Sequence, residues 1–402
     1  MTAIRHARVV IGANFGDEGK GLFTDHHVAG LDADALVVRF NGGAHPEAAP
    51  YARPGRRHVF HHVGAGALAG APTHLSRFFI ANPLLLEREL DDLAALGVRP
   101  AVTVDPAAPL TTPYDMMVNQ MAEEARGAAR HGSTGLGINE TVTRMGTGFA
   151  TRVAELADED TLRATLAAIR DEHVPARLAA LGISPDGAWC ARLADPAIPE
   201  WFLATARAVL RPAIGPMPAA RAVVFEGAQG LLLDEHHTFF PHVTRSRTGL
   251  TNVLTLAREA GIRRLDVTYA TRAYATRHGA GPFPGEEPSV VFEDATNEPN
   301  PWQGRLRFGW LDLDLLARTI RSDLSQATGI AVRPQLGVSC LDQVGDAVPF
   351  RSGGLRRTAS PEALVQAALA ATGFDTALVS RGPTRATIGA QRLETVARPR
   401  AA

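Results

Sequence analysis

The sequence predicts an α/β fold in which a glycine-rich turn joins a buried strand to a helix. Residues 9–11 form an apolar run typical of a strand inside a sheet, and residues 22–28 are typical of the start of a helix. A second apolar run at 35–40 and a helical repeat at 84–96 follow, so strands alternate with helices. At 402 residues, the chain is long enough for one large α/β domain with insertions, or for two domains.

The turn between the first strand and helix reads Gly-Ala-Asn-Phe-Gly-Asp-Glu-Gly-Lys-Gly over residues 12–21. It aims backbone N–H groups and the positive end of a helix at one point, which suits a phosphate, and Lys20 adds a positive charge. The run departs from the P-loop pattern, because Asn14 replaces its first glycine and Gly21 its Ser/Thr. Asp17 is expected to replace that hydroxyl as a Mg²⁺ ligand, and a carboxylate beside a phosphate also serves as a base. The alternative is a tight turn with solvated charges.

The composition is ordinary for a globular protein and excludes a broad basic surface. The net charge is −1, with 45% hydrophobic and 21% charged residues, so a nucleic-acid partner is not expected. Two cysteines are too few for a disulfide framework and suit a reducing compartment. No signal peptide opens the chain and no apolar run approaches the ~20 residues of a membrane span, so we predict a cytoplasmic protein without a membrane partner.

The elements that follow support one interlocked domain. The strand at 35–40 ends in a polar turn at 41–47, which should lie near the first turn because parallel strands place ligands at their carboxyl ends. A short strand is expected at 58–63, and helices at 84–96 and 116–129. The alanine-rich region Asp158–Leu210 is predicted to be helical and to cover the sheet. Without a true linker, one domain over 1–402 with a helical insertion at about 158–210 is favoured over two.

Four later segments add polar groups after apolar runs. They are Val-Val-Phe-Glu-Gly-Ala-Gln-Gly at 223–230, Pro-His-Val-Thr-Arg-Ser at 241–246, Ala-Thr-Arg-His-Gly-Ala-Gly-Pro-Phe-Pro at 275–284, and Gln-Gly-Arg-Leu-Arg-Phe-Gly-Trp-Leu-Asp at 303–312. Planar guanidinium groups such as those of Arg305 and Arg307 suit phosphate or carboxylate, although many arginines only form surface ion pairs. Each segment alone is weak evidence.

Taken together, the segments resemble the adenylosuccinate synthetase family, GTP-dependent ligases that join aspartate to IMP. The turn Gly-Asp-Glu-Gly-Lys-Gly at 16–21 matches the family signature residue for residue. Phe-Glu-Gly-Ala-Gln-Gly at 225–230, Thr-Arg with Gly-Ala-Gly-Pro-Phe-Pro at 276–284, and Gly-Trp-Leu-Asp at 309–312 follow in the family order. The resemblance implies a large, mainly parallel sheet flanked by helices, related to the P-loop nucleotide-binding proteins, in a homodimer.

The resemblance also implies roles for single residues. Asp17 would take the N1 proton of a 6-oxopurine and bind Mg²⁺, so that O6 attacks the γ-phosphate of GTP and an amino-acid amine then displaces phosphate. The phosphate and GTP site would comprise Gly16, Glu18, Gly19, Lys20, Gly21, Arg307, Asp342, Ser380 and Gly382. The purine nucleotide would contact Thr134, Gln229, Thr244, Arg305 and, from the partner subunit, Arg144. Arg305 would also serve the amino-acid carboxylate.

The sequence departs from the family pattern at its catalytic histidine. After two glycines the family has Asn-Ala-Gly-His, whereas this chain has Ala-His-Pro-Glu-Ala at 44–48, so a direct count puts Ala48 at the histidine. A shortened loop would instead bring His45 into the acid role, because histidine donates protons near neutral pH. His61 and His62 are further substitutes, although a histidine on a strand is more often packed.

The amino-acid loop departs most from the family. A Thr-Thr pair before Gly-Arg is replaced by Trp302 and Gln303 before Gly304 and Arg305, and Leu306 replaces an arginine. Losing hydroxyl and cationic partners weakens recognition of a second carboxylate. The amine donor is therefore aspartate or a variant amine.

Two further departures concern the nucleotide sites. Leu136 replaces an arginine in the Thr134 segment, and Cys340 replaces a lysine beside the guanine reader Asp342. Three hypotheses follow: the standard enzyme acting on IMP, aspartate and GTP; a ligase of the same chemistry with another amine; and a catalytically impaired nucleotide-binding paralogue. A GTPase switch is not favoured, because the turn lacks the usual Mg²⁺-binding hydroxyl.

Overall fold

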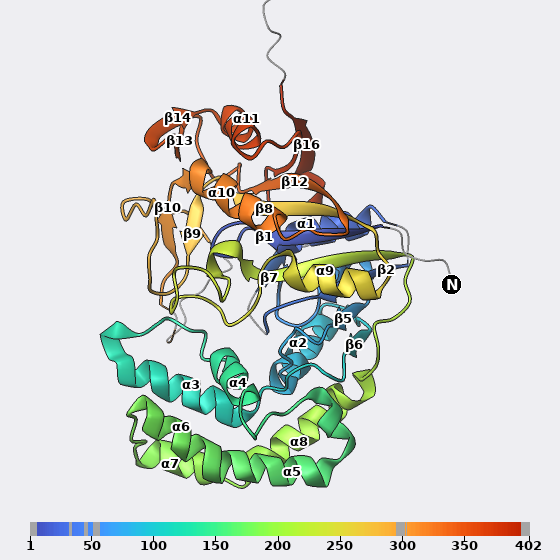
Figure 1. The fold of residues 1–402 in the computed structure, drawn as a ribbon, viewed down its shortest axis with the longest axis vertical. Helices are drawn as coiled ribbons and strands as arrows, with labels where there is room; N and C mark the ends of the chain where they lie inside the picture. Colours follow the sequence, from blue (N-terminus) through green and yellow to red (C-terminus); the bar gives the residue numbers. More distant parts are fainter. Residues whose placement is uncertain are drawn as a thin grey trace, which may run out of the picture.

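A nine-stranded sheet organises the fold in the computed structural model (Figure 1). The structure describes residues 6–31, 34–43, 47–50, 57–294, 302 and 304–394, without the side chains of 47–50 and 57. The strands of the sheet, in spatial order, are β16 (Ile388–Arg392), β15 (Thr376–Ser380), β12 (Ala331–Ser339), β8 (Arg264–Arg272), β1 (His6–Gly12), β7 (Ala222–Gly230), β2 (Ala35–Arg39), β5 (Thr73–Leu75) and β6 (Val102–Val104). Neighbours run parallel except β15 and β16, which confirms the predicted mainly parallel sheet.

The central strands are apolar because both faces of the sheet are covered. Val9 on β1 pairs in register with Phe225 on β7 and Val267 on β8, and none of the three has exposed surface. A parallel strand buried on both faces reads as a continuous hydrophobic run, which is the pattern of residues 9–11. The carboxyl ends of β1, β7 and β2 consequently meet at one edge, where the predicted site lies.

Helices flank the sheet on both faces, and three small sheets complete the chain. The helices are α1 (Lys20–Ala29), α2 (Pro83–Ala95), α3 (Pro113–Arg126), α4 (Ile138–Met145), α9 (Leu250–Glu259), α10 (Leu313–Leu324) and α11 (Pro361–Thr372). The small sheets pair β3 (Glu47–Pro50) with β4 (Arg57–Phe60), β9 (Ala275–Arg277) with β10 (Arg307–Gly309), and β11 (Leu311–Asp312) with β13 (Val348–Ser352) and β14 (Leu355–Ala359). Short helical turns are η1 (Ala65–Ala69), η2 (Gly127–Ala129), η3 (Val153–Ala157), η5 (Arg211–Ala213), η6 (Leu231–Leu233) and η7 (Arg385–Thr387).

The region Asp158–Leu210 is helical, as predicted, but it does not cover the sheet. It forms α5 (Glu159–Ala168), η4 (Ile169–His173), α6 (Val174–Leu181), α7 (Gly187–Ala194) and α8 (Ala197–Val209), which lie at the lower end of the molecule in Figure 1. Its apolar side chains, such as Phe202, share a core with Leu86 of α2 and Met117 of α3. The reason is that α2 and α3 already cover that end of the sheet and offer their own apolar faces.

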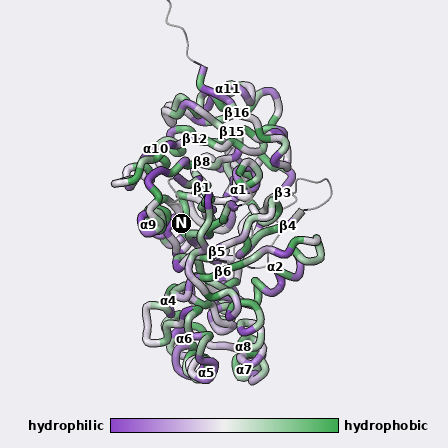
Figure 2. Tube along the Cα trace, turned by 90° about the vertical axis from the view of Figure 1, so that its right-hand side faces the viewer, coloured by the Kyte–Doolittle hydropathy of each residue, from purple (hydrophilic) through white to green (hydrophobic). Residues whose placement is uncertain are grey.

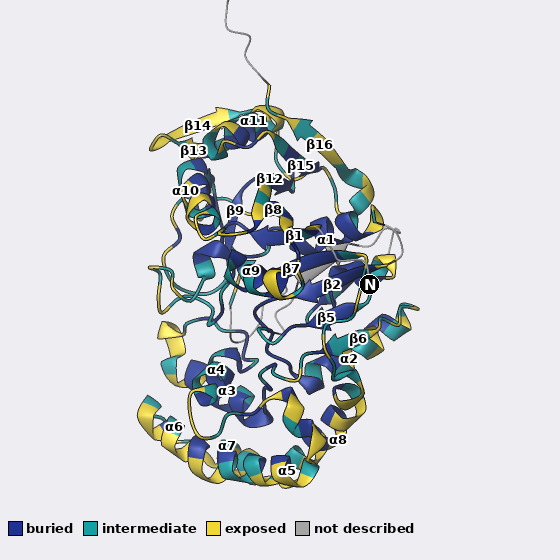
Figure 3. Cartoon of the chain, turned by 45° about the vertical axis from the view of Figure 1, so that its right-hand side comes forward, coloured by how far each residue is buried: buried dark blue, intermediate teal, exposed yellow. Residues whose placement is uncertain are grey.

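Burial and hydropathy follow this layering. Figure 3 shows the central strands buried and the outer sides of α5 to α8 exposed. Figure 2 shows that these outer helices carry both hydrophilic and hydrophobic residues, as expected for amphipathic helices on one side of a core. Within the part of the chain that the structure describes, no helix is long and apolar enough to cross a membrane.

Candidate functional site

The glycine-rich turn is held in an uncommon backbone conformation against the end of β7. Gly16 and Gly19 have positive φ angles of 94° and 83°, and Asp17 between them has φ 60°. A methyl group at Gly230 of β7 would lie 2.3 Å from the carbonyl oxygen of Asn14, so only glycine permits this approach. Among described residues, the non-glycines with positive φ are Asp17, Gln229 and Cys340, and each was singled out from the sequence. Left-handed backbone at non-glycine residues clusters at functional sites.

The turn gathers donors at one point, as predicted, but a carboxylate of the chain already lies there. Glu18 Oε1 accepts hydrogen bonds from the backbone N–H of Asn14 at 3.0 Å and of Gly16 at 2.7 Å. Lys20 Nζ, at the start of α1 beside Gly21, is 3.4 Å from Glu18 Oε2. Burial raises the pKa of Glu18 despite these partners. Glu18 therefore competes with a phosphate for the turn's donors, which differs from the phosphate-binding role predicted for it.

Asp17 is held at the mouth of the turn by a histidine that the sequence analysis did not single out. Asp17 Oδ2 is 3.2 Å from Nε2 of His278, and the Asp17 carbonyl accepts a hydrogen bond from Arg272. Burial alone would raise the pKa of Asp17, but the His278 hydrogen bond and the charges of His278, Arg272 and Lys20 together lower it. Asp17 is thus an ionised carboxylate beside the glycine-rich turn. The sequence signal that could have pointed to this contact was the histidine itself, which lies between Arg277 and Gly279 in a segment that resembles the family.

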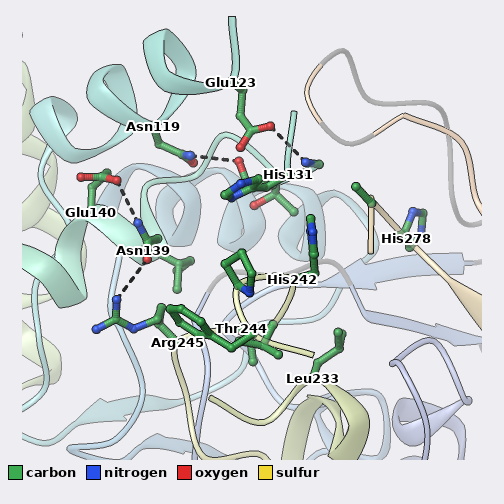
Figure 4. Close-up of a pocket in the computed structure, with 18 of the residues that line it drawn as sticks. Asn119, Glu123, His131, Asn139, Glu140, Leu233, His242, Thr244, Arg245 and His278 are labelled. Carbon is green, nitrogen blue, oxygen red and sulfur yellow. Dashed lines mark hydrogen bonds between the residues drawn. The ribbon is translucent and has the colours of Figure 1, made fainter. Parts of the chain in front are cut away.

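A pocket of about 470 Å³ lies between the helical side of the molecule and this edge of the sheet. It is lined by Thr134 before α4, Gln229 on β7 and Thr244 in the loop after η6, three residues from distant parts of the sequence. His278 lies on the opposite side of Figure 4 from Glu140, with Thr244 and His242 between them. The volume falls within the range of about 300–1,000 Å³ for small-molecule sites. The structure therefore brings together three of the five predicted purine-binding residues, whereas Arg144 and Arg305 do not line the pocket.

A buried cation, Arg277, lines the pocket. Arg277 is 2% exposed, and among the described residues its side chain donates hydrogen bonds to the carbonyl oxygens of Ala280 and His242. Its Nη1 has no hydrogen-bond partner within the part of the chain that the structure describes. Burial and the charge of Arg307 lower the pKa of Arg277 to about 10, so it remains protonated near neutral pH. A buried guanidinium without a carboxylate partner favours a phosphate or carboxylate ligand.

Arg144 does not have the role that the resemblance implied. Its side chain is fully buried in α4, and its guanidinium contacts both carboxylate oxygens of Asp115 at 2.8 Å. Further hydrogen bonds go to Thr151 Oγ1 and to the carbonyls of Phe149 and Leu110. The residue therefore faces the interior of its own chain and presents no guanidinium N–H to a partner subunit. The family resemblance assigned Arg144 to a nucleotide, whereas the hydrogen-bond partners inside its own chain fix the position of its guanidinium.

Three of the predicted GTP residues, Asp342, Ser380 and Gly382, form a second group next to the turn. The backbone N–H of Leu341 donates to the Ser380 carbonyl at 3.2 Å, and Ser339 Oγ donates to the Glu18 carbonyl at 3.0 Å. This places the exposed carboxylate of Asp342 near the Ser380–Gly382 turn. Ser380 Oγ is itself bonded to the Gly382 carbonyl at 2.7 Å, so its hydroxyl proton serves the turn.

Two arginines predicted at the nucleotides are placed differently. Arg305 is exposed and follows Gly304, which has a φ of 80°. Arg307 is an ion-pair partner of Glu286 and donates to the carbonyls of Gly279 and Gly281 at 3.0 Å. Arg305 is therefore available to a ligand, whereas Arg307 is committed to its own chain in this conformation.

The predicted loops are described only in part. His45 and Gln303 lie outside the described residues. The described part of the second turn lies against the end of β7, because Asn41 exchanges hydrogen bonds with the backbone of Ala228. The first turn packs on the same strand end, where a methyl group at Gly16 would lie 3.5 Å from Gln229 Cα. Trp302 lies against the Thr134 segment, where a methyl group at Gly135 would be 2.6 Å from the Trp302 indole.

The histidines proposed as substitutes have structural contacts. His62 is fully buried, its Nε2 accepts from the backbone N–H of Asn82 at 3.0 Å, and its Nδ1 lies 3.5 Å from Glu89. The backbone N–H of His61 donates to Glu89 at 2.8 Å. His62 is therefore a packed histidine, the more frequent case.

The described residues contain no group of three or more His, Cys, Asp or Glu side chains able to hold a metal ion. Asp17 fits the predicted Mg²⁺ in another way, because Mg²⁺ is often held by one or two carboxylates together with substrate phosphates. The carboxylate of Asp17 is 20% exposed beside the turn, so one of its oxygens is accessible to a hydrated cation.

The comparisons with known proteins agree with this geometry. The family model described as adenylosuccinate synthetase matches residues 9–373. The adenylosuccinate synthetase of Xylella fastidiosa strain M12 is 32% identical over 350 residues, covering 81% of this chain and 76% of the relative. That of Acidithiobacillus ferrooxidans is 31% identical over 362 residues, covering 86% and 81%.

Two solved structures share the fold. Fully ligated adenylosuccinate synthetase from Plasmodium falciparum superposes with a TM-score of 0.71 at 16% identity, covering 95% of this chain and 99% of that one. A cyanophage S-2L succinoaminodeoxyadenylate synthetase bound to dGMP, with dATP as an energy donor, gives 0.57 at 15% identity, covering 98% and 96%. The predicted fold and enzyme class are thereby confirmed. The chain belongs to the adenylosuccinate synthetase family, and with it to the GTP-dependent ligases that form a C–N bond.

Proposed function

We propose that the protein phosphorylates the 6-oxygen of a purine nucleotide such as IMP with GTP, and then joins an amino acid at that carbon. The observation that carries the proposal is the position of Asp17. It lies between the phosphate-binding turn and, through His278, a pocket lined by Thr134, Gln229 and Thr244. A base at this junction reaches both a purine ring and a terminal phosphate.

Different residues serve the proton transfer, the phosphate binding and the guanine recognition of the first step. Asp17 accepts the proton of the ring N1–H, which makes O6 nucleophilic toward the γ-phosphorus. Lys20 and the backbone of the turn hold phosphate oxygens once Glu18 gives up its hydrogen bonds there. Such positioning and charge stabilisation supply most of the catalysis in phosphoryl transfer. Asp342, with Ser380 and Gly382 beside it, reads guanine because a carboxylate accepts from its N1–H and 2-amino group.

Mg²⁺ fits this arrangement with Asp17 and the substrate phosphates as its ligands. When bound, it spreads the negative charge that develops on the phosphates. Asp17 is ionised for this purpose, because the neighbouring positive charges lower its pKa.

The amine is aspartate or a variant amine, and the structure of the Trp302 region favours testing both. The half-buried Trp302 packs on Gly135 beside the pocket residue Thr134. An indole offers no hydroxyl group to a second carboxylate, and this supports a test of other amines. Arg305 is exposed and is proposed to bind the carboxylate that every amino acid carries.

The impaired-paralogue alternative is not favoured, because the matched relatives are synthetases and the turn with Asp17 and Lys20 is intact. A homodimer and a cytoplasmic location remain predictions from the sequence. Sedimentation or light scattering of the purified protein tests the first of these.

A panel assay tests the proposed function. The protein is incubated with Mg²⁺, a triphosphate (GTP, ATP or dATP), a 6-oxopurine nucleotide (IMP, GMP or dGMP) and one amino acid at a time. We expect GDP release and a new nucleotide mass with GTP, IMP and one or more amines. Adenylosuccinate with aspartate alone identifies the standard donor, and product only with another amine identifies a variant. No triphosphate cleavage in any mixture would contradict the proposal.

A further inference from the structure

The imidazole of His278 is a polar group of the pocket wall to which the proposed reaction gives no task beyond its contact with Asp17. Its side chain is 15% exposed, it lines the pocket, and its Nε2 is 3.2 Å from Asp17 Oδ2. Figure 4 shows its ring beside the cavity. Among histidines offered by the sequence, His62 has no exposed surface. His278 is thus the histidine seen in contact with the base.

Packing fixes Asp17 and His278 relative to each other. Phe15, two residues before Asp17, lies under the guanidinium of Arg277, with 4.6 Å between the ring centroid and Cζ. Arg277 directly precedes His278 and is pinned by hydrogen bonds to the carbonyls of Ala280 and His242. A side chain carried by such a packed segment is pre-organised rather than mobile.

The other side of the His278 loop is equally close-packed. Gly279 has a φ of 71°, and a methyl group there would lie 3.0 Å from the carbonyl oxygens of His131 and Gly132. The backbone N–H of Ala280 donates to the His131 carbonyl at 3.3 Å. The loop is therefore held between the sheet edge and the segment before α4, with its imidazole at the cavity.

We propose that His278 donates a hydrogen bond to the attacking oxygen, so that Asp17 and His278 engage the two adjacent polar atoms of one lactam. The inference rests on the proposed function and names the group that stabilises its nucleophile. Asp17 Oδ2 and His278 Nε2 contact each other at 3.2 Å in this structure. We infer that a bound lactam replaces this contact, so that its N–H donates to Asp17 and its C=O accepts from His278.

Each proton and bond of this step is accounted for by the chemistry of the lactam. Asp17 takes the ring N–H proton, the electron pair of that bond forms a C=N bond, and negative charge moves to the oxygen. The N–H of His278 stabilises that oxygen by a hydrogen bond. The oxygen–phosphorus bond then forms while the bond from the γ-phosphorus to the bridging oxygen breaks, and GDP leaves with that electron pair.

Two substitutions distinguish a hydrogen-bond donor role of His278 from a role in packing alone. His278→Ala removes the donor, and we expect kcat to fall about 100-fold while KM for the nucleotide changes by less than about threefold. His278→Gln retains an N–H donor and is expected to recover at least about tenfold of the loss. His236→Ala is the matched control, because this exposed histidine lies in the loop after η6 but does not line the pocket, and it should behave as the wild type.

Isotope exchange gives a readout that does not depend on the amine. GTP carrying ¹⁸O in the β,γ-bridging position is incubated with Mg²⁺ and IMP alone, and scrambling of the label reports reversible phosphoryl transfer. Wild-type scrambling with about 100-fold slower exchange in His278→Ala supports the inference. Wild-type scrambling with unchanged exchange in His278→Ala overturns it and leaves the proposed function standing. Absence of scrambling in the wild type, together with no product in the panel assay, removes the proposed function and the inference with it.

A further variant keeps the test decisive if the alanine variant does not fold. His278→Phe preserves a ring of similar size but offers no donor, and circular dichroism checks its fold. Exchange in His278→Gln that exceeds exchange in His278→Phe by about tenfold supports donation by His278. Equal rates in these two variants would refute it.

Discussion

The guanidinium of Arg144 makes five hydrogen bonds inside its own chain, two of them to Asp115. We predict that Arg144→Met destabilises the protein by about 3–5 kcal/mol, because the Asp115 carboxylate is left buried without its partner. Urea unfolding followed by circular dichroism measures this. KM for the purine nucleotide should stay within about twofold in the folded variant.

A surface arginine provides the control for this prediction. Arg163 also forms several ion pairs, with Glu159, Asp160 and Glu200, but its side chain is 39% exposed. Arg163→Met should destabilise the protein far less than Arg144→Met, because water screens these exposed ion pairs. A large rise in KM with unchanged stability for Arg144→Met would restore the phosphate-binding role that the resemblance implied.

Single residues differ in how far the sequence predicted them, and the differences have physical causes. Thr134, Gln229 and Thr244 were assigned to one purine site by the family resemblance, and the structure places all three in the wall of one pocket. The roles of Glu18, Arg144 and His278 were not predicted correctly, since they depend on partners far away in sequence. No local pattern shows that Asp115 pairs with Arg144, or that His278 reaches Asp17.

At the scale of an element, helix α1 is tied to the sheet through a buried histidine. His27 is 6% exposed and hydrogen-bonds Thr268 on β8 at 2.9 Å. Burial, with smaller effects from the charges of Arg8 and His26, lowers the pKa of His27 from 6.5 to about 3. Below the unfolded pKa, the unfolded chain therefore binds a proton that the folded chain does not. The contribution of neutral His27 to the free energy of unfolding is fully present above about pH 6.5, and it is lost progressively as the pH drops toward 3.

The lowered pKa of His27 predicts a measurable effect of pH on the stability of the protein. At pH 5, roughly 1.5 units below the unfolded pKa, the loss from His27 is about 2 kcal/mol. We predict that His27→Gln loses about 2 kcal/mol less than the wild type between about pH 7.5 and pH 5, measured by urea unfolding. The exposed His236 provides the control substitution, because its side chain is in water in both states. Parallel stability curves for wild type and His27→Gln would contradict the prediction.

Elements with strong periodicity were predicted well, and their partners were not. The strands β1 and β2 and the helices α2 and α3 lie where the apolar patterns placed them, within a few residues. The helices α5 to α8 were also expected, but the prediction that they cover the sheet was wrong. Amphipathic periodicity shows that a helix has an apolar face, whereas it does not say whether a sheet or another helix covers that face.

At the scale of the molecule, the same helices decide whether the chain is one domain. Leu166 of α5 and Phe202 of α8 share one apolar core with Leu75 of β5 and Val104 of β6. A core that extends from the sheet edge into the helical region couples the two parts energetically. We therefore expect cooperative unfolding of the whole chain, in agreement with the predicted single domain.

The four tryptophans of the chain make this testable. Trp189 and Trp201 report on α7 and α8, whereas Trp302 reports on the pocket beside Gly135 and Trp310 on the segment between β10 and β11. We predict that the Trp189→Phe/Trp201→Phe and Trp302→Phe/Trp310→Phe variants each unfold at one urea midpoint that agrees between fluorescence and circular dichroism. Adding Phe202→Ala, a fully buried side chain, should cost about 3–5 kcal/mol and lower the midpoint seen by both tryptophan pairs. A shift confined to Trp189 and Trp201 would instead mean that the helical region unfolds as a unit of its own.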